Sequence, residues 1–307
     1  MDKEVKMPGY KWFTGFLRRH PNLSRRTLMS LGRERAVIPP QAVEKWFKNL
    51  KGSIAEQDKA ILDSPERIFN ADETGFSFDV KRKIVACKGS KHVYTVSSNN
   101  KTQVTVLACA SASGQYIQPL LIFPYKRIPN KNLLQDFPEA YLQVSDNGWI
   151  TASIFHIWIR DCFLPSIVNI PKPVLLLVDG HTSHTSLVET LELCAENGII
   201  LYCLLPHASH LIQPLDQAFF GSIKRSWTDA ARQHTWATGE GVNLESFGKV
   251  LKPVWTKAAT PSNASHSFKA AGIYPFNPDK VLMSGKFCPS EVYSSGDAPL
   301  ADHSLEG

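Results

Sequence analysis

The feature that most constrains the fold is a short, wholly apolar run that ends on a carboxylate. Residues 175–178 are Leu, Leu, Leu and Val; Pro171 and Pro173 precede them and Asp179 follows. An uninterrupted apolar run of this length, bounded by turn-forming residues, is typical of a strand buried on both faces of a sheet. Because a buried charge is costly unless it is paired, Asp179 at the end of that strand needs partners.

The stretches around this run alternate between strand-like and helix-like patterns. Apolar and β-branched residues bounded by turn signals favour strands, whereas apolar residues three and four positions apart favour helices. We predict strands at 66–72, 83–86, 103–110, 116–123 and 199–203, and helices that begin near 153 and span about 187–196. Strands that first follow one another and then alternate with helices are typical of a mixed α/β sheet rather than of an all-β sandwich.

The first 52 residues have an all-helical pattern. Three short helices are marked by Trp12, Phe13, Phe16 and Leu17 in the first, by the N-cap Ser24 in the second, and by Val43, Trp46, Phe47 and Leu50 in the third. His20-Pro21 ends the first helix and Pro39-Pro40 opens the third. Three short helices joined by compact turns fit a helix-turn-helix module.

The basic excess of the chain lies in the same region. Residues 1–60 hold 13 Lys and Arg against 6 Asp and Glu, whereas the remainder holds 21 against 22. Arg25 and Arg26 fall in the first turn of the second helix, where cations oppose the helix dipole, so a phosphate or a base edge is a candidate ligand for them. A solvated basic face is the equal alternative.

Composition excludes several classes of protein. The chain is 43% hydrophobic and 20% charged, as in a globular protein with a sizeable core. No run of 18 apolar residues and no secretory signal are present, so we expect neither a membrane partner nor secretion. The six cysteines form no Cys-x-x-Cys pair, and we expect reduced core residues rather than a zinc site.

Three aspartates occupy similar settings. Asp72 ends the first predicted strand, Asp179 ends the apolar strand, and Asp216 begins a predicted helix. Each alone could cap a turn or a helix. Together, carboxylates on rigid elements at one edge of a sheet are what a hard cation such as Mg²⁺ or Mn²⁺ requires.

The helix after Asp216 gives that carboxylate a direction. Asp216, Phe220, Ile223, Trp227 and Ala230 fall along one helical face. We therefore expect Asp216 to point with the apolar face toward the body of the protein.

Neighbouring acids and histidines compete for roles at the same site. Side chains alternate along a strand, so Glu73 faces away from Asp72 and only one of the two can join the site. His181 and His184 follow Asp179, and a second pair stands at 207 and 210. Neither pair has the helical spacing of a zinc hydrolase, so we expect His181, His184 and Glu73 to support the site or face the substrate.

Taken in order, these motifs resemble the DDE superfamily endonucleases of the pogo, Tigger and jerky-like transposase group. The matching stretches are Asn-Ala-Asp-Glu-Thr-Gly (70–75), the run 175–184, the stretch 205–225 and Phe-Lys-Ala-Ala-Gly-Ile-Tyr-Pro-Phe-Asn-Pro (268–278). Residues 8–21, with Arg25, Arg26 and Trp46-Phe47, resemble the distal part of a centromere-protein-B-type helix-turn-helix. The family has further helices before that motif, so the DNA-binding region is expected to be only partial here.

The resemblance implies a ribonuclease-H-like mixed sheet with flanking helices, preceded by the small helical segment. It implies Asp72, Asp179 and Asp216 as catalytic ligands of two Mg²⁺ or Mn²⁺ ions that cleave double-stranded DNA, followed by strand transfer. Lys224 and Arg225, with Arg25 and Arg26, are candidate DNA contacts. A DNA role implies the nucleus as location and allows a homo-oligomer, and no small-molecule cofactor is expected.

The organisation expected from these patterns has four parts. They are a partial helix-turn-helix (1–52), a connecting helix (53–65), a catalytic domain (66–283) and a disordered tail (284–307). Two other functions stay open at this point. One is a catalytically silent DNA-binding or chromatin protein derived from such a transposase, and the other is a nuclease that acts on RNA or hybrids.

Overall fold

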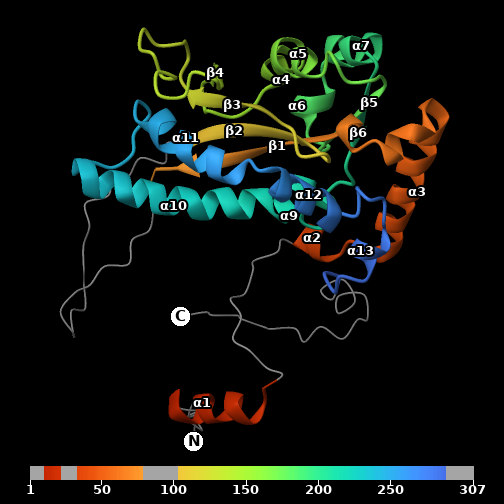
Figure 1. Ribbon diagram of the computed structural model, residues 1–307, viewed down its shortest axis with the longest axis horizontal. Coiled ribbons are helices and arrows are strands. Elements are labelled where there is room, and N and C mark those ends of the chain that lie inside the picture. Colours follow the sequence, from red (N-terminus) through yellow and green to blue (C-terminus); the bar gives the residue numbers. More distant parts are fainter. Residues whose placement is uncertain (1–9, 22–32, 79–102, 288–307) are drawn as a thin grey trace, which may run out of the picture. The chain divides into compact units, whose positions relative to one another are not determined.

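The computed structural model describes residues 10–21, 33–78 and 103–287 (Figure 1). The chain divides into two compact units, residues 1–33 and residues 34–307. In the first unit, α1 (Tyr10–Arg19) confirms the helix predicted to end before His20-Pro21, and Trp12 stacks on Phe16 with ring centroids 5.3 Å apart. The second predicted helix, with Arg25 and Arg26, lies outside the described residues.

The described part of the second unit is built on one six-stranded sheet with the order β4-β3-β2-β1-β5-β6. The strands are β1 (Ile68–Ser77), β2 (Gln103–Ser111), β3 (Tyr116–Pro124), β4 (Tyr141–Ser145), β5 (Val174–Val178) and β6 (Ile199–Cys203). β2 pairs antiparallel with β1 and β3, whereas the pairs β3–β4, β1–β5 and β5–β6 are parallel. The predicted mixed sheet is therefore confirmed, while the predicted strand at 83–86 lies outside the described residues.

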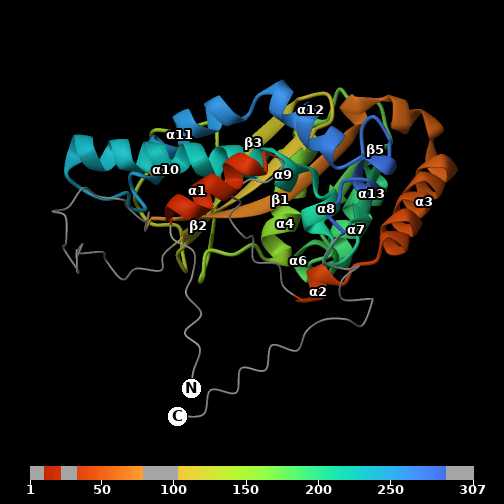
Figure 2. The same ribbon diagram turned by 90° about the horizontal axis from the view of Figure 1, so that it is seen from below.

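Strand β5 has the burial that its sequence predicts. All five of its residues are buried, because it lies between β1 and β6 and helices cover both faces of the sheet (Figures 1 and 2). On one side are α4 (Ala152–Trp158), the π-helical turn Ile159–Phe163, α5 (Leu164–Ser166), α6 (Thr182–Thr185) and α7 (Val188–Glu196). On the other are α8 (Ser209–Ile212), α9 (Pro214–Gln217), α10 (Phe219–Thr238), α11 (Phe247–Ala258), α12 (Pro261–Ala270) and α13 (Asp279–Leu282).

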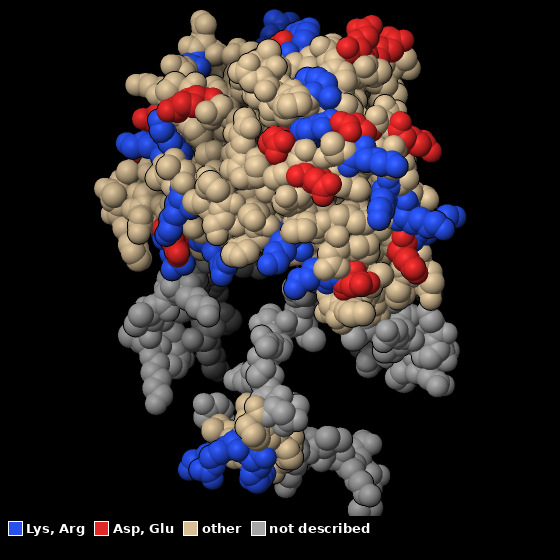
Figure 3. Space-filling view, turned by 45° about the vertical axis from the view of Figure 1, so that its right-hand side comes forward, with Lys and Arg blue, Asp and Glu red and all other residues tan. Residues whose placement is uncertain are grey.

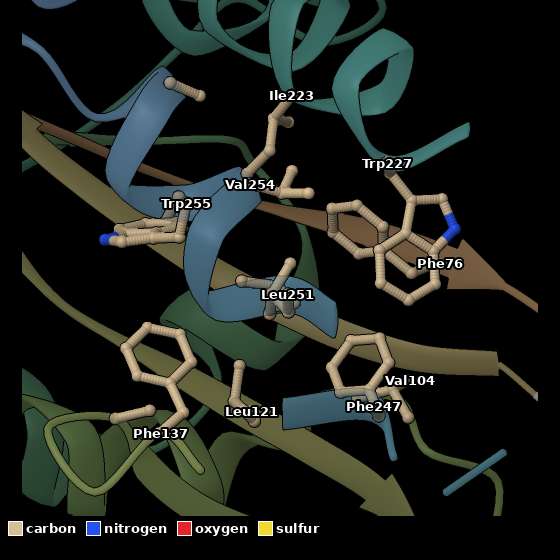
Figure 4. Close-up of a cluster of buried hydrophobic side chains, with 14 of the residues drawn as sticks. Phe76, Val104, Leu121, Phe137, Ile223, Trp227, Phe247, Leu251, Val254 and Trp255 are labelled. Carbon is tan, nitrogen blue, oxygen red and sulfur yellow. The ribbon is translucent and has the colours of Figure 1, made fainter. Parts of the chain in front are cut away.

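An aromatic core fixes the long helices α10 and α11 to the sheet. Figure 4 shows Phe76 of β1, Trp227 of α10 and Phe247 of α11 in one apolar cluster with aliphatic side chains of β2, β3 and α11. The Trp227 ring centroid lies 5.1 Å from that of Phe76 and 5.2 Å from that of Phe247. Because such rings bury large apolar areas in fixed geometry, they set the position of α10 and of the segment that leads into it.

The third predicted helix differs from the expectation. α3 (Pro40–Gln57) is one 18-residue helix, so the predicted boundary at residue 52 cuts through it and the predicted connecting helix is its last turn. The 3-10 turns Lys59–Asp63 and Pro65–Arg67 then lead into β1. α2 (Arg33–Ala36) precedes α3.

The apolar face of α3 belongs to the same core as the sheet. Trp46 Nε1 donates to the Cys203 carbonyl of β6 at 3.0 Å, and the Phe47 ring meets that of Phe276 at 5.7 Å. The compact unit that contains the sheet therefore begins at residue 34 rather than at 66. The tail also differs at its start, since Phe287 is 4% exposed and packs in this core.

Candidate active site at the carboxyl end of β5

The register of two parallel strands brings two of the aspartates to one level. Asn70 of β1 pairs with Leu177 of β5, and the same offset places Asp72 opposite Asp179, just beyond the end of β5. Contrary to the prediction, Asp72 does not end its strand. β1 continues to Ser77 alongside β2. The two carboxylates nevertheless share the edge where β5 stops, and such an edge is the usual place for a site in an α/β sheet.

Asp72 lies in a strongly negative environment. The half-buried side chain accepts the backbone N–H of Glu73 on Oδ1 at 2.9 Å. Burial raises the pKa of Asp72 well above its usual value, and the charges of Glu73, Asp216 and Asp179 raise this pKa further. The carboxylate is therefore in electrostatic contact with both other candidate ligands.

Asp179 is held from one side only. Its Oδ1 contacts Nδ1 of His184 at 2.7 Å and accepts the backbone N–H of His181 at 3.1 Å. Burial alone would raise the pKa of Asp179, but the hydrogen bonds and the positive charge of His184 outweigh it and lower this pKa. Asp179 therefore stays ionised, with a third of its side chain exposed.

His184 connects Asp179 to the far face of β1. Its Nε2 lies 2.8 Å from Oε1 of Glu73, while only 1% of the side chain is exposed. Burial opposes the charged form, yet Asp179 and Glu73 together raise the pKa of His184 to about 10. Both ring nitrogens then donate to carboxylates, so neither has a lone pair for zinc. Glu73 faces away from Asp72, as the strand alternation predicts.

Asp216 departs from its predicted direction. A break at Ala218, with φ −140° and ψ −45°, separates α9 from α10, so Asp216 does not continue the apolar face of the long helix and is exposed. Phe220, Ile223 and Trp227 are buried as predicted. Partial enclosure raises the pKa of Asp216, the charges of Lys224 and Arg35 lower it, and that of Asp179 raises it.

One buried amide that the motif reasoning did not identify joins the three elements of the site. Asn70 Nδ2 donates to the Leu177 carbonyl of β5 at 3.0 Å and to Gln213 Oε1 at 2.9 Å, and its Oδ1 accepts the Leu215 N–H at 3.1 Å. Asn70 and Gln213 are both 0% exposed. The signal in the sequence was a polar residue inside an apolar strand, two positions before Asp72.

The remaining predicted site residues are one histidine after β5, two basic residues of α10 and two arginines near the N-terminus. His181 lies beside Ser183, with Nδ1 to Oγ at 2.8 Å. Lys224 and Arg225 are exposed on α10, where the Arg225 Nε donates to the Gly221 carbonyl of the same helix at 3.1 Å. Arg25 and Arg26 lie outside the described residues.

The donor set fits a hard divalent cation. In the described ranges, no group of three or more His, Cys, Asp or Glu side chains stands in a ready metal-holding arrangement. The three aspartates nonetheless supply only oxygen ligands. The charges of Asp216 and Asp179 raise the pKa of Asp72, and that of Asp179 raises the pKa of Asp216. The buried side chain of Gln213 lies beside Asp72 and partly offsets the rise in its pKa. A cation would offset the repulsion among these carboxylates.

Comparison with known proteins gives the family context. The profile of the DDE superfamily endonucleases matches residues 101–267. A Cochliobolus lunatus protein named MFS-type transporter clz9 is 31% identical over 230 residues, covering 73% of this chain and 24% of that protein. The Jerky protein of Mus musculus is 27% identical over 62% of this chain and 34% of its own length. CENP-B homolog protein 2 of Schizosaccharomyces pombe is 23% identical over 71% and 44%.

The chain thus spans less than half the length of these curated relatives. None of the described helices is long and apolar enough to cross a membrane.

Solved structures share the fold. The Mos1 mariner paired-end complex with Mn has a TM-score of 0.54 at 13% identity, covering 91% of this chain and 70% of that one. The corresponding complex with Mg has a TM-score of 0.53 at 14% identity with the same coverage. The mixed sheet with flanking helices is therefore of the ribonuclease-H-like kind found in a transposase.

Proposed function

Because the chain belongs to the DDE superfamily endonucleases, we propose that it cleaves phosphodiester bonds of double-stranded DNA with Mg²⁺ or Mn²⁺ ions held by Asp72, Asp179 and Asp216. Strand transfer would follow cleavage. The observation that carries the proposal is the strand register that places Asp72 of β1 opposite Asp179 at the end of β5, while the charge of Asp216 on α9 raises the pKa of Asp72. The complexes of Mos1 with Mn and Mg, which share the fold, support the choice of metal.

The chain's own residues would bind and orient. Asp179 is proposed as the central ligand, because the register of β5 on β1 places it opposite Asp72 and its charge raises the pKa of Asp216. With Oδ1 occupied by His184 and the His181 N–H, Oδ2 is left to face a metal. Asp72 and Asp216 would each add one ligand. Two divalent cations, when bound, activate the attacking water or 3′-hydroxyl and stabilise the leaving oxygen.

Glu73 and His184 would act on Asp179 rather than on DNA. The imidazolium of His184 is fixed between two carboxylates, so it has no proton acceptor site with which to serve as a general base. It keeps Asp179 ionised and aims its free oxygen. Four basic residues are proposed as contacts to DNA phosphates outside this centre. They are Lys224, Arg225, Arg25 and Arg26.

The proposal includes the cellular setting. A DNA substrate places the protein in the nucleus, and cleavage at two transposon ends would be served by a homo-oligomer. Fluorescence microscopy of the tagged chain tests the nuclear location. Sedimentation with and without DNA tests the oligomeric state.

The decisive test replaces Asp179. We expect Asp179→Asn to abolish nicking of supercoiled plasmid in Mg²⁺ or Mn²⁺, because an amide oxygen binds these ions weakly. The thermal midpoint should fall modestly, because the buried His184 loses one of its two charged partners, so nicking is measured well below that midpoint. The control is Asp161→Asn, an exposed carboxylate paired with Arg160 at 2.6 Å, which should nick normally.

Full nicking by Asp179→Asn would overturn the metal-ligand proposal. A wild-type chain that binds duplex DNA but nicks it with neither metal would instead establish the silent DNA-binding alternative. RNA–DNA hybrid and RNA substrates in the same assay test the alternative of a nuclease that acts on RNA or hybrids. Preferential cleavage of either substrate would favour that alternative.

A further inference from the structure

The two edges of the six-stranded sheet differ in how they are covered. β6 forms one edge, and α3 lies against it: Trp46 Nε1 donates to the Cys203 carbonyl at 3.0 Å, and the Trp46 ring meets that of Tyr202 at 5.9 Å. β4 forms the other edge, and among the described residues no strand pairs with its outer side. An edge strand of this kind presents backbone N–H and C=O groups to any further strand, so it is a template for pairing.

β4 lacks the features that usually keep an edge strand unpaired, which are charged side chains, proline and bulges. Its sequence is Tyr-Leu-Gln-Val-Ser, its register with β3 is regular, and all five of its residues are partly exposed. The acid that precedes it, Glu139, is neutralised by Lys252 at 2.9 Å. By contrast, Figure 3 brings the α3 side of the molecule forward and shows basic and acidic side chains interspersed over that face. The β4 edge therefore favours a partner strand.

The order of side chains in β4 makes the strand complementary to itself. Two copies of one edge strand that are related by a two-fold axis pair antiparallel, and each contact then occurs twice. With Gln143 at the axis, Leu142 of one copy lies opposite Val144 of the other, and Tyr141 lies opposite Ser145. Leu142 and Val144 both pack against the aromatic core under α10 and α11, so the two apolar pairs extend that core across the axis. Cross-strand pairs of this kind stabilise a sheet.

The turn after β4 holds an exposed tryptophan beside the open edge. Trp149 is 55% exposed, its N–H donates to Asn147 Oδ1 at 3.0 Å, and its carbonyl accepts the Ser145 hydroxyl at 2.7 Å. These bonds fix the turn to the last residue of β4. Antiparallel pairing brings the turn toward the stretch that precedes Tyr141 in the second copy, where Pro138 is exposed. Tryptophan is enriched at interfaces between proteins, so Trp149 adds apolar area to the strand pair.

We propose that β4 is the interface of a homodimer, in which two copies of this chain pair antiparallel about Gln143 and join their sheets into one. The inference deepens the proposed function, and it rests on that function for the use of the dimer, which is to hold two DNA ends. Pairing at β4 leaves the edge with Asp72 and Asp179 open, because three strand spacings of about 4.8 Å separate β4 from β1. Two five-residue strands and a turn bury less than the area of about 1,200 Å² that stable interfaces need, so the dissociation constant should be micromolar.

The test places charges at the proposed axis. Sedimentation equilibrium of the full chain without DNA, over a micromolar concentration series, gives the dissociation constant of the dimer. Gln143→Lys and Gln143→Glu each set two like charges opposite each other, so each variant alone should raise this constant about tenfold. An equimolar mixture of the two variants sets opposite charges there and should restore association. Mixing would not restore an association that misfolding had abolished.

Matched controls separate the interface from a general effect of charge. Gln233→Lys and Gln233→Glu make the same changes at an exposed residue of α10 and should leave the dissociation constant unchanged. Trp149→Ala should weaken association without a change in the thermal midpoint, because the side chain is exposed in the single chain. Hydrogen exchange in residues 141–145 should slow as the protein concentration rises, whereas exchange in residues 199–203 of β6 should not.

The outcomes distinguish the dimer interface from the nuclease. A chain that stays monomeric over the whole series, yet nicks plasmid, overturns the β4 interface and leaves the proposed function standing. A dimer that neither charge variant weakens, or that the mixture does not restore, also overturns it, because another surface then joins the copies. A dimer that the mixture restores, in a chain that nicks DNA with neither metal, supports the interface and overturns the nuclease.

Discussion

At the scale of residues, the site depends on one buried histidine between two carboxylates. His184 spans β1 and the end of β5, and its two nitrogens lie 2.8 Å from Glu73 and 2.7 Å from Asp179. We expect His184→Gln to lower plasmid nicking about 10- to 100-fold and to raise the Mn²⁺ concentration required, because groups that orient metal ligands have effects of this size. Nicking rates across a Mn²⁺ series check this.

The comparison variant for this prediction is Glu73→Gln. Its carboxamide oxygen still accepts from His184 Nε2, so the imidazole keeps its orientation, and nicking should fall less than in His184→Gln. His184→Gln also leaves Glu73, 15% exposed, without its charged partner, and the free energy of unfolding should drop by about 3 kcal/mol. An unchanged metal requirement in His184→Gln would reduce its role to packing.

At the scale of elements, Asn70 determines how α9 sits on the sheet. Its amide bonds to β5 and Gln213, and its oxygen holds the Leu215 N–H one residue before Asp216. We expect Asn70→Ala to reduce the free energy of unfolding by about 3 kcal/mol, since buried donors and acceptors are left unsatisfied. Nicking should also fall when it is measured well below the melting temperature, where nearly all of the variant is folded and the lower stability cannot account for the loss of activity.

A matched control is available on the neighbouring strand. Ser111 of β2 is 0% exposed, and its Oγ accepts the Gln115 N–H at 3.0 Å. Ser111→Ala should also lower stability but leave the metal requirement as it is. Equal effects of the two substitutions on nicking would show that Asn70 acts through stability alone.

The same elements show what the sequence can and cannot predict. Apolar runs and alternation predicted β5, the mixed sheet and the opposite directions of Asp72 and Glu73, because these depend on local periodicity. Periodicity also predicted the buried face of α10, but it could not show the break at Ala218 that leaves Asp216 exposed. Asn70 was missed because its partners lie 107 to 145 residues away in the chain.

At the scale of the whole molecule, the least predictable feature was which part covers the apolar face of α3. Val43, Trp46, Phe47 and Leu50 give the same helical pattern whether the partner is another short helix or a distant strand. Here Cys203 of β6 and Phe276 of the stretch 268–278 are the partners. Only the assembled fold brings that C-terminal stretch against α3, so a boundary drawn from local pattern fell inside the helix.

This difference predicts two outcomes for shortened chains. A chain of residues 34–307 retains the whole sheet-containing unit, and its thermal midpoint should match that of the full chain. A chain of residues 58–307 lacks α3 and exposes the core that Trp46 and Phe47 cover. Because each large aromatic side chain removed from a core costs about 3–5 kcal/mol, the shorter chain should not fold cooperatively.

Circular dichroism melts and plasmid nicking measure both chains. Residues 34–307 keep Asp72, Asp179 and Asp216, so nicking of non-specific plasmid should persist, while any DNA affinity that Arg25 and Arg26 contribute should be lost. A folded, active 58–307 chain would show that α3 is dispensable and that the catalytic unit begins after it. Loss of folding in 34–307 would show instead that residues 1–33 are part of the same cooperative unit.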